Sequence, residues 1–328
     1  MSRTWKPTLL YAAAHFAVDF GCAYAMFAIC TPNALGFLLY NFCAFAMQMP
    51  MGVLADALGH NRRFAICGTL LVALICALPS LGGAGCMILG LGNGLFHVGG
   101  GLDVLNLSGR RSAPLGVFVS PGAYGIYLGT LLGKLGVSPL PVIGLLCLAC
   151  GGMLLFRSDK LPANAPFDLP DRKTVPLAAL LFLVVVLRSY GGMAGAFEWK
   201  TGLWAFAAVS AVVLGKTAGG FLADCFGAKR TAAVSLFLAA MLFCCSRWAV
   251  PGVLALFLFN VTMPITLFAL AQAMPNCKGF SFGLLTFALF LGFLPTYLGA
   301  GTISGWGIAI VAAASAVLLL PALGRKEA

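Results

Sequence analysis

The sequence predicts an all-helical integral membrane protein with twelve transmembrane helices in two pseudo-symmetric six-helix bundles. Three observations predict it: the composition, the number of long apolar runs, and a loop sequence that occurs twice. Hydrophobic residues make up 61% of the 328 residues and charged residues only 9%, against roughly 45–50% and 25% in soluble domains. Such a chain has too little polar surface to coat a soluble fold, whereas a bilayer accommodates it.

A spanning helix needs about 20 mostly apolar residues. Runs of this kind occur near 7–30, 34–57, 64–80, 83–106, 114–135, 138–157, 175–197, 201–223, 231–247, 250–274, 279–299 and 302–322. The segment 158–174 is charged and rich in proline, so we predict that it is a cytoplasmic linker. It would join an N-terminal bundle over 1–157 to a C-terminal bundle over 175–328.

The basic residues predict the orientation of the chain. With both termini in the cytoplasm, fifteen Lys and Arg residues fall in cytoplasmic segments, and only Lys134, Lys200 and Arg247 fall outside. This distribution follows the positive-inside rule, so we expect a multi-pass protein of the plasma membrane, in a bacterium the inner membrane. It also argues against a nucleic-acid partner, because the positive charge is spread over short loops.

One loop sequence is written twice. Residues 52–63 read G-V-L-A-D-A-L-G-H-N-R-R, and residues 220–230 read G-F-L-A-D-C-F-G-A-K-R. The shared Gly, Asp, Gly and Arg recur with an offset of 168 positions, about half the chain. Both copies follow the second expected helix of their half on the cytoplasmic side, which predicts an internal duplication.

Both loops resemble the signature of the major facilitator superfamily. Residues 116–125, G-V-F-V-S-P-G-A-Y-G, resemble a motif of its antiporters. Three further segments resemble its fosmidomycin-resistance-like branch of drug:proton antiporters: A-H-F-A-V-D-F, G-L-G-N-G-L-F-H-V-G-G-G and L-R-S-Y-G-G. The resemblance implies an alternating-access transporter whose first, fourth, seventh and tenth helices line a central cavity. The fourth helix lacks the arginine common in the drug exporters, so their coupling chemistry does not transfer to this chain.

Charged side chains inside the hydrocarbon are costly and therefore mark functional sites. His15 and Asp19 share a face of the first helix because they are spaced i, i+4. Our hypothesis is that Asp19, with His15 or His97, exchanges a proton, while Arg188 holds an anionic substrate group or acts as a counter-charge. Asp19 and Arg188 lie 169 positions apart, so the pseudo-symmetry would place them across the cavity from one another. The full predicted set is Asp19, His15, His97, Asn93, Arg188 and Tyr124.

Two plainer interpretations remain open for these residues. Asp19 and Arg188 could pair only to lock the two bundles together. His15 could simply form a hydrogen bond between helices.

A second set of residues is predicted to close the cytoplasmic side. In the superfamily, an acid near the end of the fourth helix joins the Asp and Arg of the repeated loop in a charge relay, which the resemblance implies for Asp103. The loop glycines are expected to permit close helix packing and tight turns. The predicted gate comprises Gly52, Asp56, Gly59, Arg62, Arg63, Asp103, Asp224, Gly227, Lys229 and Arg230.

The sequence therefore predicts a secondary active transporter that exports a small solute in exchange for protons. The alternative is a proton- or ion-coupled uptake symporter for a small metabolite, since the same fold supports both directions. No pairing of nucleophile and base is apparent, so we do not expect an enzyme. His15, His97 and Asp19 as a metal set is a minor alternative, and we predict no metal and no cofactor. The expected partners are the solute, protons and membrane lipid, with the chain acting as a monomer.

Overall fold

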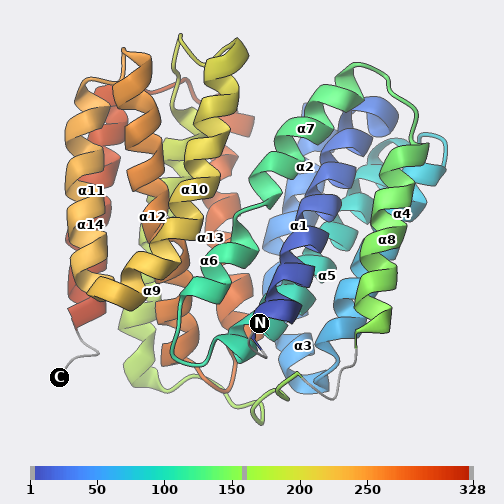
Figure 1. Cartoon of the computed structure of the whole chain (residues 1–328), viewed down its shortest axis with the longest axis horizontal. Helices are drawn as coiled ribbons and strands as arrows, with labels where there is room; N and C mark the ends of the chain where they lie inside the picture. The colour runs from blue at the N-terminus through green and yellow to red at the C-terminus, as the bar shows by residue number, and fades with distance from the viewer. Residues whose placement is uncertain (1–3, 157–160, 325–328) are drawn as a thin grey trace. The chain divides into compact units, whose positions relative to one another are not determined.

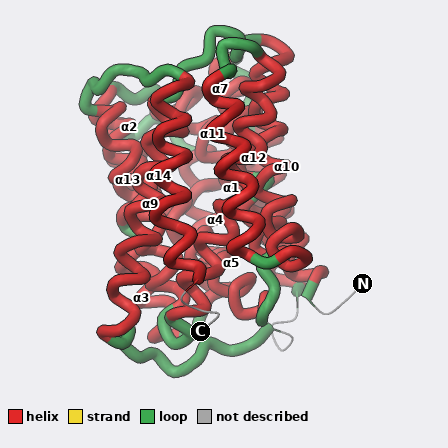
Figure 2. The backbone as a smooth tube through the Cα atoms, turned by 90° about the vertical axis from the view of Figure 1, so that its left-hand side faces the viewer, coloured by secondary structure: helices red, strands yellow, loops and turns green. Residues whose placement is uncertain are grey.

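The computed structural model describes residues 4–156 and 161–324. Over these residues the backbone is helical, with loops at the helix ends and a single isolated bridge between Gly195 and Ile303 (Figure 2). The predicted all-helical membrane fold is confirmed. The predicted boundary at residue 157 and the first residues of the linker lie outside the described residues.

Six helical rods form the first half of the chain, coloured blue to green in Figure 1. The first ends in a π-helical turn, η1, the second contains one, η2, and the fifth is broken between α6 and α7. The elements are α1 (Trp5–Ala25) with η1 (Met26–Cys30); α2 (Ala34–Asn41), η2 (Phe42–Ala46) and α3 (Gln48–Leu58); α4 (Asn61–Ala77); α5 (Gly82–Ser108); α6 (Ala113–Val119) and α7 (Gly122–Lys134); and α8 (Leu140–Leu155).

Six further rods form the second half. They are α9 (Val175–Ala194), preceded by the short 3-10 turn η4 (Arg172–Thr174), then α10 (Gly202–Phe226), α11 (Ala228–Cys244), α12 (Ala249–Ala273), α13 (Lys278–Tyr297) and α14 (Gly305–Gly324). Nine rods of the described chain are long and apolar enough to cross a bilayer. The other three, α4, α8 and α11, have 17, 16 and 17 residues. Each of the twelve predicted runs corresponds to one rod.

The chain packs into two compact units that differ from the two sequence halves. Unit 1 comprises Met1–Gly109, Val117–Leu169 and Pro275–Phe287, and unit 2 comprises Arg110–Gly116, Pro170–Met274 and Ala288–Ala328. Each unit therefore contains a short segment from the other half of the sequence. The start of α13 packs in unit 1, and the start of α6 packs in unit 2. The division of the sequence into two repeated halves stays a prediction.

Glycines allow the helices within each unit to approach until their backbones touch. In unit 1, a Cβ atom added to Gly68 of α4 would lie 2.4 Å from the carbonyl oxygen of Gly92 in α5. In unit 2, one added to Gly219 of α10 would lie 2.0 Å from the carbonyl oxygen of Val261 in α12. Any larger residue would force these pairs apart, as expected where helices associate by close packing of small residues.

Candidate functional site

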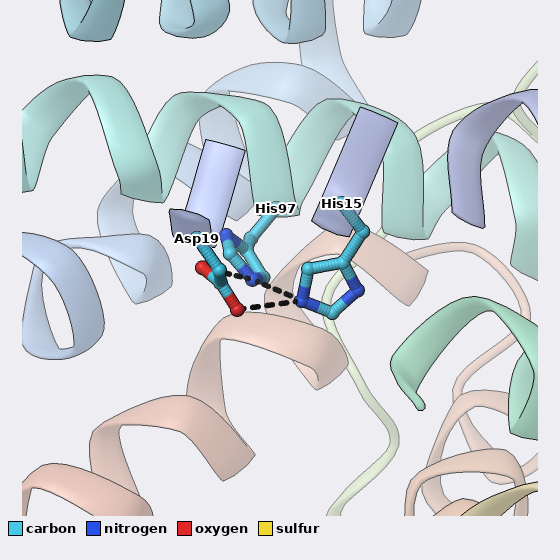
Figure 3. A group of neighbouring side chains, drawn as sticks. All are labelled: His15, Asp19 and His97. Carbon is cyan, nitrogen blue, oxygen red and sulfur yellow. Dashed lines mark hydrogen bonds and ion pairs between the residues drawn. The ribbon is translucent and has the colours of Figure 1, made fainter. Parts of the chain in front are cut away.

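A cluster of titratable side chains lies in the interior of unit 1. We call His15, Asp19 and His97 the proton cluster; α1 supplies the first two and α5 the third (Figure 3). The two imidazole Nε2 atoms are 2.8 Å apart, and the Asp19 carboxylate lies 3.1 Å from Nε2 of His15 and 3.7 Å from Nε2 of His97. His15 is 5% and Asp19 7% exposed, so all these groups interact in a nearly dry environment.

The remaining ring nitrogen of each histidine faces a backbone carbonyl group. Nδ1 of His15 lies 2.7 Å from the carbonyl oxygen of Phe118, and Nδ1 of His97 lies 2.8 Å from that of Asn93. A carbonyl oxygen only accepts hydrogen bonds, so both Nδ1 atoms carry a hydrogen. Two neutral rings would then point lone pairs at one another from their Nε2 atoms. A hydrogen bond between the rings at this 2.8 Å distance would use one further proton, placed beside the Asp19 carboxylate.

Asn93 completes the surroundings of the carboxylate. Its side-chain Nδ2 donates to Asp19 Oδ1 at 2.9 Å and also approaches the Cys22 sulfur at 3.5 Å. Asn93 and His97 are spaced i, i+4 on α5, as His15 and Asp19 are on α1. The structure thus brings together four of the six residues predicted for the cavity.

The same three side chains could hold a metal ion, because one ligand atom from each lies within 4.8 Å of the others. Two nitrogens bound to one tetrahedral zinc at ordinary bond lengths lie about 3.3 Å apart. The observed 2.8 Å is shorter and matches a hydrogen bond between the rings. The arrangement described here therefore fits a shared proton better than a metal, and the expectation of no metal stays a prediction.

Helix α7 covers the cluster with its first residue. A Cβ atom at Gly122 would lie 2.2 Å from Asp19 Oδ2 and 2.4 Å from His15 Nε2. The helix is broken at Pro121, since α6 ends at Val119 and α7 begins at Gly122. This break also sets the carbonyl group of Phe118 toward His15. Sequence analysis missed both roles, although the glycine and proline of the antiporter-like motif were the available signal.

The predicted gate residue Asp56 holds the beginning of α13 within unit 1. Its two carboxylate oxygens accept from the backbone N–H groups of Gly279 and Phe280, each at 2.8 Å. Gly52 permits this approach, because a Cβ there would lie 2.1 Å from the carbonyl oxygen of Gly279. A carboxylate at a helix N-terminus is stabilised by the free N–H groups and by the helix dipole. Burial raises the pKa of the neighbouring Cys277 thiol to about 11, so the thiol stays neutral.

Asp224 plays the equivalent part within unit 2. It accepts from the N–H groups of Ser112 at 2.7 Å and Ala113 at 3.0 Å, and from the Ser112 hydroxyl at 2.8 Å. The two copies of the repeated loop thus each hold the start of a helix. Gly59 and Gly227 adopt φ values of +67° and +87°, a region that favours glycine.

Asp103 lies in a polar network of unit 1, and its part in a charge relay stays a prediction. It accepts from the Tyr11 hydroxyl and, at 2.8 Å, from Asn61 Nδ2. Arg62 instead donates to the carbonyl oxygen of Phe156. Among the described residues, no ion pair joins either loop arginine to Asp56 or Asp103. A buried carboxylate can be satisfied by neutral donors, and two such donors are present here.

The linker enters the same network through Asn164. Its Oδ1 accepts from Asn61 at 2.7 Å and from Asn106 at 2.8 Å, and its Nδ2 donates to the carbonyl oxygen of Ala55 at 3.0 Å. Lys278, at the start of α13, donates to Asn106 at 3.1 Å. The linker, the repeated loop and the start of α13 therefore share one set of hydrogen bonds. Nothing in the sequence distinguished Asn164 from other polar linker residues.

Arg188 lies in unit 2, buried on α9. Its Nη2 donates to the carbonyl oxygen of Phe259 at 2.8 Å, and its guanidinium carbon lies 5.0 Å from the centre of the Phe259 ring. Its Nε is buried without a hydrogen-bond partner. The predicted juxtaposition of Arg188 with Asp19 concerns two different units and stays a prediction.

The other predicted residues occupy less central places. Tyr124 lies half-buried on α7, two residues beyond Gly122. Arg63 and Arg230 are exposed, and the Lys229 ammonium group lies beside Gly324 at the end of α14. Their assignment to the cavity or to the gate stays a prediction.

No protein-family model and no curated protein sequence matches the chain. Solved structures do match over nearly its whole length. The transporter FucP in its outward conformation gives a TM-score of 0.76 at 15% identity, covering 99% of both chains. A variant of the E. coli fucose:proton symporter FucP gives 0.69 at 11% identity, covering 98% of this chain and 99% of that one. The human organic anion transporter MFSD10 gives 0.68 at 16% identity, covering 97% and 99%.

The chain has the major facilitator fold. Identities of 11–16% establish this fold and leave the fosmidomycin-resistance-like branch as a resemblance of the sequence alone.

Proposed function

We propose that the chain is a secondary active transporter that moves a small solute across the plasma membrane by alternating access, coupled to protons through the proton cluster. The fold is shared with transporters, including a fucose:proton symporter. The observation that carries the coupling is the 2.8 Å contact between Nε2 of His15 and Nε2 of His97, which needs a proton to hold it together.

The contacts around the cluster suggest how a proton would drive movement. Removing the shared proton leaves two lone pairs and a carboxylate facing one another, with Asn93 as the donor to the carboxylate. Each unsatisfied buried polar group costs about 1–3 kcal/mol, and an unbalanced charge costs more. Separation of α1 from α5 and α7, or entry of water, would relieve this cost. Deprotonation therefore favours a conformation in which these helices are further apart.

The two loop aspartates form the proposed cytoplasmic gate. Asp56 and Asp224 each cap a helix in one conformation and release it in another, which closes and opens the cytoplasmic side. The termini face the cytoplasm of a bacterial cell, and the chain works as a monomer surrounded by lipid. These points are supported by the two symmetric capping contacts and by the distribution of basic residues.

For direction, we propose efflux by exchange of solute for protons. The support is the antiporter-like stretch 116–125, in which Gly122 lies directly on the proton cluster and Pro121 lies at the break between α6 and α7. Uptake by proton symport is the second candidate, favoured by the likeness of the fold to a fucose:proton symporter.

The test is expression in a bacterial host without its own major efflux pumps, challenged with toxic small compounds that include fosmidomycin. Efflux predicts tolerance to at least one compound, lost in Asp19→Asn and kept in Asp168→Asn, which changes an exposed linker aspartate. Increased sensitivity to a compound, with the same dependence on Asp19, would establish uptake in place of efflux. An Asp19→Asn protein that is inserted normally and transports as well as wild type would refute the coupling role.

A further inference from the structure

Arg188 carries a buried positive charge that unit 2 leaves uncompensated. The side chain is 9% exposed. None of the described carboxylates of the unit, on Asp171, Glu198 and Asp224, forms an ion pair with it. One N–H group donates to Phe259, and the Phe259 ring face supplies a cation–π contact, while the buried Nε–H has no acceptor. A buried charge is costly without an opposite charge, so binding an anion would stabilise this guanidinium.

The obvious internal candidate for that anion already has its partners. Asp19 accepts from Asn93 at 2.9 Å and lies 3.1 Å from Nε2 of His15 and 3.7 Å from Nε2 of His97. Its charge is thus accounted for within unit 1. The charge on Arg188 is not accounted for within unit 2. This difference between the two charges indicates that Arg188 binds a ligand and does not form a permanent internal ion pair.

An open approach to the guanidinium lies one turn further along α9. A Cβ atom at Gly192 would have no neighbour within 4 Å. At 3.6 residues per turn, Gly192 lies about 40° from Arg188 around the helix, whereas the exposed Leu183 lies about 140° from it. The neighbouring face, at Ser189, packs on α13 through its hydroxyl, which donates to the carbonyl oxygen of Leu289 at 2.7 Å. The missing side chain at Gly192 therefore leaves open space one turn from Arg188, about 40° around α9.

We propose that Arg188, stacked on Phe259 and approached past Gly192, is the binding site for an organic monoanion of the carboxylate class. One guanidinium balances one negative charge, and its parallel N–H groups match the two oxygens of a carboxylate. The proposal rests on the proposed transport function for its biological meaning, and it names the class of the transported solute.

The test measures binding directly on the full-length protein in detergent. Thermal unfolding is recorded with acetate, benzoate and indole-3-acetate, and with the matching amides, which have similar shapes and no charge. A carboxylate that binds the folded state raises the unfolding temperature in a saturable way. We expect at least one carboxylate to do so and its amide not to. In Arg188→Gln the apparent affinity should fall by roughly tenfold or more.

Two matched controls separate a binding site from a structural role. Arg247→Gln removes an exposed arginine that also lies over an aromatic ring, 5.3 Å from that of Trp248, and should keep full binding. Gly192→Leu should block binding without changing any charge. Gly144→Leu fills an equally open glycine position on α8 and should keep binding. If all three carboxylates leave the unfolding temperature unchanged, or if Arg188→Gln binds as wild type does, the proposal is wrong.

This experiment is independent of transport. Binding in detergent needs no proton gradient, so a loss of transport with intact carboxylate binding would refute the proposed function and leave the anion site standing. Proton-coupled transport by a protein that binds no carboxylate would refute the anion site and leave the proposed function standing.

Discussion

Substituting Gly122 by alanine should disrupt the proton cluster through a single methyl group. Gly122 is the first residue of α7, and its Cα faces the side chains of α1. The added Cβ would lie 2.2 Å from Asp19 Oδ2, 2.4 Å from His15 Nε2 and 2.8 Å from His15 Cδ2. Ordinary contacts begin near 3.4 Å, so the carboxylate must retreat by about 1.2 Å or α7 must move away from α1.

Retreat of α7 is opposed by the rest of the same helix face. Cβ atoms at Gly125 and Gly129 would lie 2.5 Å from Phe16 O and 2.3 Å from Phe20 O, so α7 and α1 are in backbone contact over two further turns. Overpacking of this kind costs about 1–3 kcal/mol. Loss of a hydrogen bond to a charged group costs about 1.5–3 kcal/mol. Since the two effects share one displacement, we expect a destabilisation of about 2–4 kcal/mol and a cluster that no longer holds its proton.

The assay compares Gly122→Ala with Gly144→Ala. Gly144 also lies within a helix, on α8, where a Cβ meets nothing within 4 Å. Alanine there should raise stability by about 0.5–1 kcal/mol, because it restricts the unfolded chain and favours the helix. Thermal unfolding in detergent should therefore move in opposite directions for the two variants, and transport should be lost only in the first. Equal stability and equal transport for both would refute the close packing of α7 on the cluster.

Three further predictions concern the gate and the network beside it. Asp56→Ala and Asp224→Ala should each lower stability by about 1–2 kcal/mol, because each removes a helix-capping carboxylate. The measurement is thermal unfolding, and if both variants unfold at the wild-type temperature, the caps are not needed. Asn164→Ala should release the linker, so trypsin should cleave it faster than in wild type, and an unchanged rate would contradict its anchoring. Tyr11→Phe should cost about 1–3 kcal/mol by leaving Asp103 with one donor fewer, and thermal unfolding as in wild type would speak against that hydrogen bond.

Hydropathy, loop charge and the repeated loop were sufficient to predict the membrane fold. Apolar runs map onto helices because a bilayer requires them to be helical, and this constraint is local. Local spacing also paired His15 with Asp19, since residues four apart share a helix face.

The sequence could not predict what depends on contacts between distant segments. The Asp56 carboxylate caps a helix that begins more than two hundred positions later. The carbonyl group of Phe118 fixes the His15 tautomer only because α6 ends before Pro121. Asn164 looked like any polar linker residue until the linker was seen to enter the network of unit 1. In each case the partner is a backbone group or an amide, which leaves no distinctive signal in the sequence.

The charge relay shows that residue types also leave the hydrogen-bond partners of a buried carboxylate undetermined. The resemblance implied carboxylate–arginine pairs, yet Asp56 and Asp103 are satisfied by N–H and O–H donors in this structure. Neutral donors can meet the needs of a buried carboxylate as well as a cation does, and their geometry decides which is used. Residue types alone named these carboxylates, whereas the donors that satisfy them came from the structure.

The central claim is that His15 and His97 share a proton whose charge balances Asp19. The chain has only three histidines, His15, His60 and His97. Nitrogen-15 NMR of histidine-labelled protein, with His60→Gln to simplify the spectrum, therefore reports on the cluster directly. At neutral pH we predict that both Nδ1 atoms are protonated, that the two Nε2 atoms share one further proton, and that Asp19→Asn abolishes this state. A spectrum of two neutral imidazoles, unchanged by Asp19→Asn, would contradict the account.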